Sequence, residues 1–550
     1  MWCKKGSLAT FTWLMVCAVA LGACGDNRVG RAFESILPDP SEYVYGAVVA
    51  DDSAAVVAAQ EILAKGGTAA DATVALYFTL AVTTPSVASI GGGGVCMVHN
   101  PRTGKTEMLD FIGSVPASGL ASGDRPSAVP GNIRGMAALH GKLGRLPWST
   151  LLEKAETLAR QGHIVSKRTA QDLARAAGPL FADAQARLVF ATGAGSPVAE
   201  GYPVRQVELG AALGQIRARG AGTFYTGSLG DRFVQGVRQA GGTLTKKDLR
   251  DYMPYWRPAV SVPFGEDIFY TAGHPVLAGM VAAQMWQMLV TDDRYAKAPA
   301  EERPHLLAEV ARRALAGRSD WMSANGNASK RVEQWLSPEQ ARQLMSSYRP
   351  SQATTETEGP QRDFNENRSG SGFVVVDGTG MAVACTVTLY NPFGTGRLVP
   401  GIGAFLAQAP GLGSRNPFAL APVVVTDRRG RLFRFGAAGT GGETLASAIV
   451  NVAARTILDK EPLKDAIASG RIHWASAENA VAVEPSETAP RVGTLTSRGH
   501  KVQRRRDLGR LNVIYCPTGL PTPSLRKVRC NPEADSRGEG FGATFLIELE

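Results

Sequence analysis

A cysteine that follows a short apolar segment carries the clearest chemistry in the N-terminal region. Cys24 comes directly after Leu-Gly-Ala at residues 21–23, and an apolar run at residues 8–23 follows two lysines. Small residues before a cysteine suit a signal peptidase, and the thiol can take a diacylglyceryl group. The run is too short for a typical membrane-spanning helix. We therefore expect residues 1–23 to be a lipoprotein signal peptide and Cys24 to be lipidated, with ordinary secretory cleavage just before it as the alternative.

A lipidated Cys24 attaches the mature chain to a membrane surface without spanning it. No later run of the sequence is apolar enough over a spanning length. Gly25 stands where an aspartate would have indicated retention in the inner membrane. We expect a protein of the bacterial cell envelope that is anchored through lipid, faces the periplasm and resides at the outer membrane.

Four further cysteines remain once those of the signal peptide and the lipid site are set aside. Cys96 and Cys385 lie in apolar runs, and we expect them to be buried core residues. Cys516 and Cys530 flank a loop at residues 517–529 that contains several prolines. Because the periplasm is oxidising, we predict a disulfide between Cys516 and Cys530.

The metal-ligating residue types show no recognisable spacing. The chain has no CxxC pair and no HExxH motif, and its seven histidines are dispersed. Zinc sites can usually be recognised in a sequence by such motifs. We expect no dedicated zinc site, no other metal site and no cofactor.

Composition narrows the class of protein. The chain has 550 residues, of which 44% are hydrophobic and 20% charged, which excludes a disordered tail and a small disulfide scaffold. The net charge is +10, from 59 basic and 49 acidic residues. The basic residues are scattered and accompany no nucleic-acid-reading motif, so we expect no nucleic-acid partner.

The elements that would position these residues fall into two regions. The first opens with a strand, two helices and a strand pair, and helices then dominate from about residue 130 to 345. Residues 351–370 are polar and contain one large apolar residue, Phe364, so we expect an exposed, mobile segment. The second region has two hairpins and then a glycine-rich stretch that leads into a helix. This pattern predicts a layered α/β/β/α sandwich. We expect strands at 47–50, 95–98, 105–111, 373–376, 381–389, 423–426 and 431–435, and helices at 53–65, 71–82, 146–162, 209–219, 224–240, 278–290, 305–316 and 445–458.

The order of segments resembles the gamma-glutamyltransferase family of N-terminal-nucleophile hydrolases, from about Gly46 to Leu549. The resemblance implies an α+β fold with a four-layer αββα sandwich. It also implies a division into a linker at 24–45, a large-subunit-like region at 46–350, a possible self-cleavage region at 351–370 and a small-subunit-like region at 371–550. The stretches that carry the resemblance are 61–71, 89–94, 109–111 with 116–117, 129–131, 144–148, 224–225, 248–249 with Tyr252 and 256–257, 318–320, 393–394 and 439–442.

Members of that family cut themselves before a threonine, which then acts as the N-terminal nucleophile with its own amine as base. A second threonine supports the hydroxyl, and paired glycines supply an oxyanion hole through backbone N–H groups. By resemblance these supporting roles fall to Thr388 and to Gly441 and Gly442.

The nucleophile does not match. The family reads Thr-Thr-His-Phe/Tyr-Ser-Val-Val-Asp where residues 370–377 read Gly-Ser-Gly-Phe-Val-Val-Val-Asp. In strict register the nucleophile falls on Gly370, which has no hydroxyl, and Ser371 is one place later. One residue along a strand reverses the face of the side chain, so Ser371 can serve only if the strand start slips. A cut between Gly370 and Ser371 would then be needed.

The residues that would bind a glutamyl group are also replaced. The family arginine falls on Ile112, the asparagine after Thr-Leu on Tyr390 with Asn391 next to it, and the paired serines on Phe418 and Ala419. Hydrogen bonds to charged groups contribute about 1.5–3 kcal/mol each, so losing two would weaken binding about 10²- to 10⁴-fold. The sequence does not determine whether the guanidinium of Arg134 replaces that of the missing arginine.

These differences from the family leave three alternative hypotheses for the function. We favour an envelope lipoprotein of the family with weak or no glutathione hydrolase or transpeptidase activity, whose small-molecule or peptide ligand the sequence does not name. The first alternative is a self-processing amidase or acylase that uses Ser371 on a more apolar acyl substrate. The second is an ordinary gamma-glutamyl hydrolase or transferase.

Overall fold

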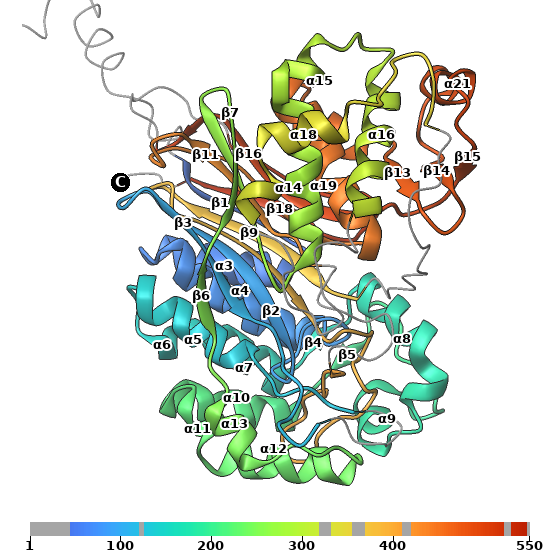
Figure 1. Ribbon diagram of the computed structural model, residues 1–550. Coiled ribbons are helices and arrows are strands. Elements are labelled where there is room, and N and C mark those ends of the chain that lie inside the picture. The colour runs from blue at the N-terminus through green and yellow to red at the C-terminus, as the bar shows by residue number, and fades with distance from the viewer. Residues whose placement is uncertain are drawn as a thin grey trace, which may run out of the picture.

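Two antiparallel sheets form the centre of the molecule and helices cover both of their outer faces (Figure 1). The computed structural model describes residues 44–119, 126–317, 332–354, 369–409, 420–521 and 530–546. Some positions discussed above lie outside these residues. They are Cys24, where lipidation is expected, Phe418, Ala419 and most of the expected mobile segment. The arrangement confirms the predicted αββα sandwich.

The first sheet has seven strands and carries the segment that would bear the nucleophile. β9 lies between β1 and β10, so its backbone is paired on both edges. The strand order is β18 (Phe541–Leu546), β1 (Val44–Ala50), β9 (Ser371–Asp377), β10 (Ala382–Thr388), β2 (Gly93–Asn100), β3 (Lys105–Phe111) and β6 (Tyr255–Pro258).

The second sheet has six strands, and β12 in it contacts β9 and β10 of the first sheet. Its order is β17 (Asn531–Ala534), β16 (Arg510–Leu520), β12 (Phe433–Thr440), β11 (Val423–Asp427), β8 (Asp267–Thr271) and β7 (Val260–Phe264). Two smaller sheets join β13 (Ile472–Ala475), β14 (Ala480–Val483) and β15 (Val502–Arg504), and β4 (His163–Ile164) with β5 (Pro203–Val204).

Helices from distant parts of the sequence form the two outer layers. α4 (Ala69–Thr83) is buried over its whole length, and with α3 (Ser53–Ala64) it covers the first sheet. α14 (Leu277–Val290) and α19 (Leu445–Ala453) cover the second sheet, and α16 (Arg303–Ala316) packs against α14 and β13. The remaining helices are α5 (Asn132–Leu143), α6 (Trp148–Leu151), α7 (Glu153–Gln161), α8 (Lys167–Leu180), α9 (Ala184–Phe190), α10 (Val207–Arg219), α11 (Gly222–Tyr225), α12 (Ser228–Gln239), α13 (Lys246–Asp251), α15 (Arg294–Lys297), α17 (Val332–Trp335), α18 (Pro338–Leu344), α20 (Leu463–Ala468) and α21 (Ala489–Ser497).

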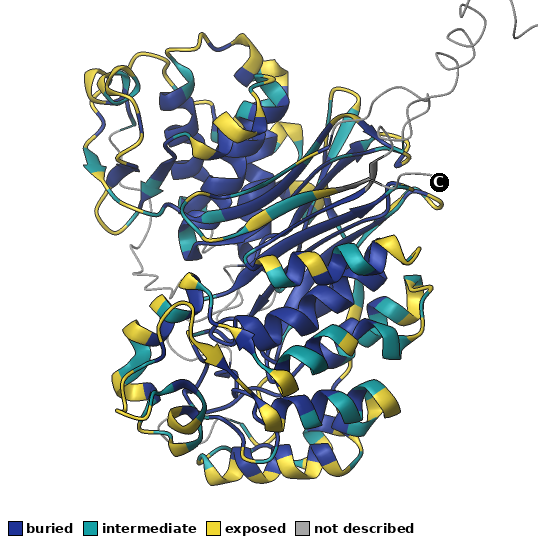
Figure 2. Ribbon diagram, turned by 180° about the vertical axis from the view of Figure 1, so that it is seen from behind, coloured by how far each residue is buried: buried dark blue, intermediate teal, exposed yellow. Residues whose placement is uncertain are grey.

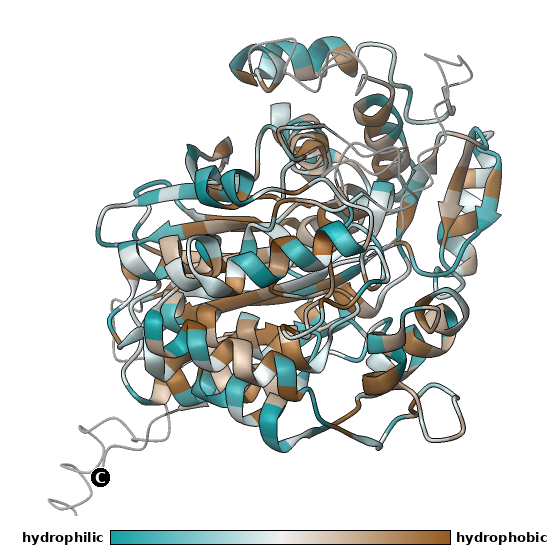
Figure 3. Cartoon of the chain, turned by 90° about the horizontal axis from the view of Figure 1, so that it is seen from below, coloured by the Kyte–Doolittle hydropathy of each residue, from teal (hydrophilic) through white to brown (hydrophobic). Residues whose placement is uncertain are grey.

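Burial follows these layers. The central strands of both sheets are buried, whereas edge strands such as β6 and β17 and the outermost helices are partly exposed (Figure 2). The same division appears in hydropathy, with apolar residues on the central strands and polar residues on the outer helix faces (Figure 3). No helix in the described part of the chain is both long and apolar enough to cross a membrane.

Most of the expected elements are present, and the differences are local. The helix expected at 146–162 is two helices, α6 and α7, and that expected at 224–240 is α11 followed by α12. The glycine-rich stretch after residue 435 continues as a strand to Thr440. Strands β6, β7 and β8 interrupt the region that was expected to be dominated by helices. The sequence pattern of a buried strand is weak here, because β6 and β7 contain Pro258 and Pro263 and have exposed positions.

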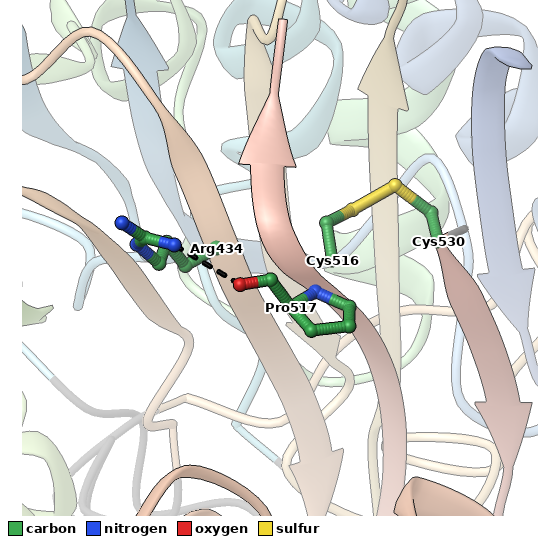
Figure 4. Close-up of a disulfide and its surroundings, with 4 residues drawn as sticks. All are labelled: Arg434, Cys516, Pro517 and Cys530. Atoms are coloured by element: carbon green, nitrogen blue, oxygen red, sulfur yellow. Dashed lines mark hydrogen bonds between the residues drawn. A yellow bond between two sulfur atoms is a disulfide. The ribbon is translucent and has the colours of Figure 1, made fainter. Parts of the chain in front are cut away.

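Two disulfides connect the strands. Cys516 and Cys530 are bonded as expected, near the carbonyl of Pro517 that accepts a hydrogen bond from Arg434 Nη1 at 3.0 Å (Figure 4). Cys96 and Cys385 are buried as expected, but they are also bonded to each other, which the sequence did not indicate. They stand opposite each other in the β2–β10 register.

Peptide mapping without reduction should recover the Cys96 and Cys385 peptides as one cross-linked species. The two Cα atoms are 4.0 Å apart across paired strands, so the bond needs no change of register. Liquid chromatography with mass spectrometry before and after reduction measures this, and the Cys516–Cys530 pair is the internal control. Free thiols at 96 and 385 in protein whose other pair is oxidised would contradict the structure.

Candidate active site

The first residues of β9 lie at one end of the sandwich, where β10 and β12 also end. Ser371 is paired with Val387 of β10, which is paired with Gly94 of β2, and Gly94 with Phe111 of β3. The ends of four strands therefore form one row. Several expected positions, namely Ile112, Gly370, Ser371, Thr388, Tyr390 and Asn391, lie near this row, because they follow, precede or end these strands.

Alternation along β9 decides which side chains face the second sheet. Val374 and Val376 belong to the core between the sheets, whereas Phe373 and Val375 pack against α3 and α4. Ser371 shares the odd parity of the helix-facing side chains, because successive side chains point to opposite faces. The strand start does not slip, since Ser371 is already in register with its partner on β10.

Gly370 occupies the position that faces the second sheet. A Cβ atom on Gly370 would lie 3.0 Å from Cγ2 of Thr440 at the end of β12, and 3.1 Å from the carbonyl oxygen of Val387. Gly370, which strict register aligns with the nucleophile of the family, therefore faces the second sheet, but it has no hydroxyl.

Thr388 lies beside Gly370 and is fully engaged with the backbone. Its Oγ1 donates to the carbonyl oxygen of Ser369 at 2.8 Å and accepts the N–H of Tyr390 at 2.8 Å. These bonds hold the chain as it leaves β10 and fix the carbonyl directly before Gly370. The threonine expected to support a nucleophile is in place, and it supports a main-chain turn.

Gly441 and Gly442 directly follow Thr440, whose Cγ2 is the nearest atom to a Cβ on Gly370. A Cβ on Gly441 would be 2.8 Å from the Cα of Gly509, and Gly442 has φ +60°. Both positions therefore favour glycine for steric reasons alone. The structure places Gly370 beside Thr388 and Thr440, and the hydroxyl of Ser371 is bonded to Asp51.

Ser371 instead belongs to a buried polar network. Its side chain is fully buried, and its Oγ donates to Oδ2 of Asp51 at 2.9 Å. Asn512 Nδ2 donates to Oδ1 of Asp51 at 2.7 Å and to the carbonyl oxygen of Gly372 at 2.6 Å. Arg168 Nη1 lies 3.7 Å from Oδ2 of Asp51. The sequence did not single out Asp51, Arg168 or Asn512, because these residues are hundreds of positions from Ser371 or carry no motif.

A cavity of about 420 Å³ opens beside Ile112, past the end of β3. Ile112 is half-buried in its wall, together with apolar residues such as Val115 and Met253. The charged side chains in the lining are three carboxylates and one amine. They are Asp110, Asp248, Asp251 and Lys247.

Each of those carboxylates already has a cation or a hydrogen-bond donor. Arg257 Nε contacts Asp110 at 2.9 Å, and the N–H of Ala117 donates to Asp248 at 2.8 Å. Lys247 is paired with Asp251. The pocket thus offers no free cation among its described lining residues.

Two further positions expected to bind substrate, Tyr390 and Asn391, are buried or bonded within the chain. Tyr390 has φ +64° and is buried, and burial raises the pKa of its hydroxyl well above the usual range. Asn391 donates to the side-chain oxygen of Gln408. Phe418 and Ala419 lie outside the described residues.

Arg134 caps a helix. Its Nη1 donates to the carbonyl oxygens of Leu249 at 3.3 Å, Arg250 at 2.9 Å and Tyr252, at the C-terminus of α13. Its guanidinium also stacks over the ring of Tyr225 at 4.2 Å. Cations are favourable at helix C-termini, so these contacts account for the arginine without a ligand.

Comparison with known proteins adds independent information. The family model of gamma-glutamyltranspeptidase matches residues 55–545. The glutathione hydrolase proenzyme of Pseudomonas aeruginosa is 30% identical over 469 residues, which cover 78% of this chain and 82% of that protein. The glutathione hydrolase proenzyme of Escherichia coli K12 is 24% identical over 548 residues, covering 90% and 93%. Cephalosporin acylase from Bacillus halodurans superimposes with a TM-score of 0.76 at 23% identity, covering 91% of this chain and 96% of that one.

Proposed function

Since the chain belongs to the gamma-glutamyltranspeptidase family, we propose that it is a member with weak or no glutathione hydrolase or transpeptidase activity. One observation carries this proposal. At the start of β9, the residue beside Thr440 of the second sheet is Gly370, and the neighbouring hydroxyl, that of Ser371, donates to Asp51. A hydroxyl nucleophile of this family acts through its own oxygen, and a glycine cannot supply one.

The pocket beside Ile112 supports the same proposal. A glutamyl group brings a carboxylate, and the described lining presents three carboxylates against one amine that is already paired. Like charges at short distance oppose binding, and Ile112 offers no hydrogen bond to offset the desolvation of the ligand. The ligand that suits this wall is a small molecule or peptide with an apolar part and no exposed negative charge.

Localisation is part of the proposal. We place the chain in the bacterial envelope, anchored through lipid on Cys24 and facing the periplasm, most simply at the outer membrane. The support is the signal-peptide pattern of residues 1–24 and the oxidising environment that two disulfides require.

The mature protein extracted from membranes should run as one chain on a denaturing gel and should not hydrolyse glutathione or a gamma-glutamyl anilide above a heat-denatured control. Mass spectrometry of its peptides reads both the diacylglyceryl group on Cys24 and the continuity of the chain through 370–371. Two chains, the smaller starting at Ser371, would favour the amidase alternative. Turnover of either glutamyl substrate would favour an ordinary family enzyme.

Replacing Ser371 separates a structural from a catalytic serine. Ser371→Ala removes a hydrogen bond to a carboxylate and should lower the free energy of unfolding by about 1.5–3 kcal/mol without changing the single-chain pattern. The matched control is Ser86→Ala, because Ser86 is also buried and donates to Asp172 at 2.8 Å. If the wild type is cleaved and only Ser371→Ala prevents cleavage, the serine is a nucleophile.

A further inference from the structure

Three metal-ligating side chains converge in the outer helical layer, away from the glycine pair and the cavity. α16 places His305 and Glu309 four residues apart and therefore on one face of the helix. His500 comes from the chain just before β15. All three side chains are buried, and one potential ligand atom of each lies within 4.8 Å of the others.

The ligand atoms face one another at distances close to those of a coordination sphere. His305 Nδ1 is 2.7 Å from His500 Nε2, and His500 Nε2 is 3.9 Å from Glu309 Oε1. Zinc bonds of about 2.0–2.1 Å in a tetrahedron separate neighbouring ligand atoms by roughly 3.3 Å. Shifts of less than about one ångström would bring these atoms to that spacing.

Hydrogen bonds from neighbouring groups orient His305 and Glu309 in the way that metal ligands are usually oriented. His305 Nε2 lies 2.9 Å from the carbonyl oxygen of Arg349, which can only accept, so Nε2 carries the proton and Nδ1 presents its lone pair. Glu309 accepts the hydroxyl of Thr354 at 2.6 Å and the Thr354 N–H at 3.1 Å, and is paired with Arg313.

We propose that His305, Glu309 and His500 bind one Zn²⁺ ion, with water as the fourth ligand. Without the ion, His500 donates its Nε2 proton to His305 Nδ1. When the ion binds, His500 carries that proton on Nδ1 instead, so that Nε2 can bind the metal and both histidines stay neutral. The ion joins α16 to the segment before β15. Glu309 also connects it to Thr354, which follows α18 in the chain. Its role is structural, since the site is buried and lies in the outer layer of helices. The positive charge of Arg313 opposes the ion and limits its affinity.

Untagged mature protein, freed of metal by a chelator and desalted, should bind one zinc per chain after incubation with ZnCl₂ and desalting. Elemental analysis measures the stoichiometry, and zinc should also raise the thermal midpoint. Glu309→Gln and His500→Asn should each weaken zinc binding at least tenfold. His163→Asn is the control, because His163 is another buried histidine whose pKa burial lowers, and it is not part of the cluster.

A wild-type chain that retains no zinc, or variants that bind as tightly as the wild type, would reduce the cluster to a hydrogen-bonded imidazole pair beside a salt bridge. The cobalt-loaded wild type keeps the test decisive if the variants do not fold. Tetrahedral Co²⁺ with nitrogen and oxygen ligands has intense visible absorption, and its absence would overturn the proposal.

Discussion

Asp535→Ala should lower the free energy of unfolding by about 3–5 kcal/mol, the loss expected when one partner of a buried ion pair is removed. Asp535 and Arg471 are both buried and are paired with each other. Arg537 contacts the same carboxylate at 2.9 Å and is also paired with Glu484. Without Asp535, the buried guanidinium of Arg471 would keep its bond to the carbonyl oxygen of Gly509 but would lose the carboxylate with which it is paired.

This cluster lies directly behind the glycine pair. Arg471 donates to the carbonyl oxygen of Gly509, and Asp535 accepts the N–H of Leu511 at 3.0 Å. Gly509 is the residue whose Cα would be 2.8 Å from a Cβ on Gly441. The ion pairs therefore hold the segment that packs against the candidate oxyanion glycines.

Urea unfolding followed by circular dichroism measures the effect. The matched control is Asp231→Ala, because Asp231 is paired with Lys246 at 2.7 Å but both side chains are more than half exposed. An exposed pair should contribute less than about 1 kcal/mol. Equal losses in the two variants would contradict the buried cluster.

The pH dependence has a definite sign. Burial alone would raise the pKa of Asp535, but Arg471 and Arg537 hold it below its usual value. The stabilisation is therefore present above the ordinary aspartate pKa of about 3.9 and is lost as the pH falls through the folded-state value. The difference between the wild type and Asp535→Ala should narrow below about pH 4.

Local sequence patterns predicted the elements that are long or strongly apolar. β1, α3, α4 and the β2–β3 hairpin were expected within a few residues, because continuous apolar runs end at capping or turn residues. Asp52 caps α3, for example, by accepting the N–H groups of Ala54 and Ala55. Strands β6 to β8 were not expected, because they are short and partly exposed, and β6 and β7 contain proline.

Contacts between distant residues could not be predicted in this way. The pairing of Cys96 with Cys385 depends on the register of β2 and β10, which lie 289 residues apart. The bond between Ser371 and Asp51 likewise joins residues 320 positions apart. The alternation of side chains along a strand was enough to predict that Ser371 and Gly370 face opposite sides of β9. The structure was needed to determine which side holds Thr388 and the glycine pair.

Gly372→Ala should cost about 3 kcal/mol, the upper end of the range for overpacking a core. A Cβ on Gly372 would lie 2.2 Å from the backbone nitrogen of Gly439 and 2.4 Å from the carbonyl carbon of Ala438. Both atoms belong to the backbone of β12, which cannot rotate away as a side chain can. The two sheets would have to separate next to Gly370.

The same substitution at Gly141 is the control for this prediction. Gly141 lies in α5, where an added Cβ would meet no atom within 4 Å, so Gly141→Ala should stabilise the chain by about 0.5–1 kcal/mol. Urea midpoints of the two variants should therefore move in opposite directions. If Gly372→Ala were tolerated within 0.5 kcal/mol, β9 would not approach β12 through its even-numbered residues. Ser371 could then face the glycine pair, and the reason for excluding it as a nucleophile would disappear.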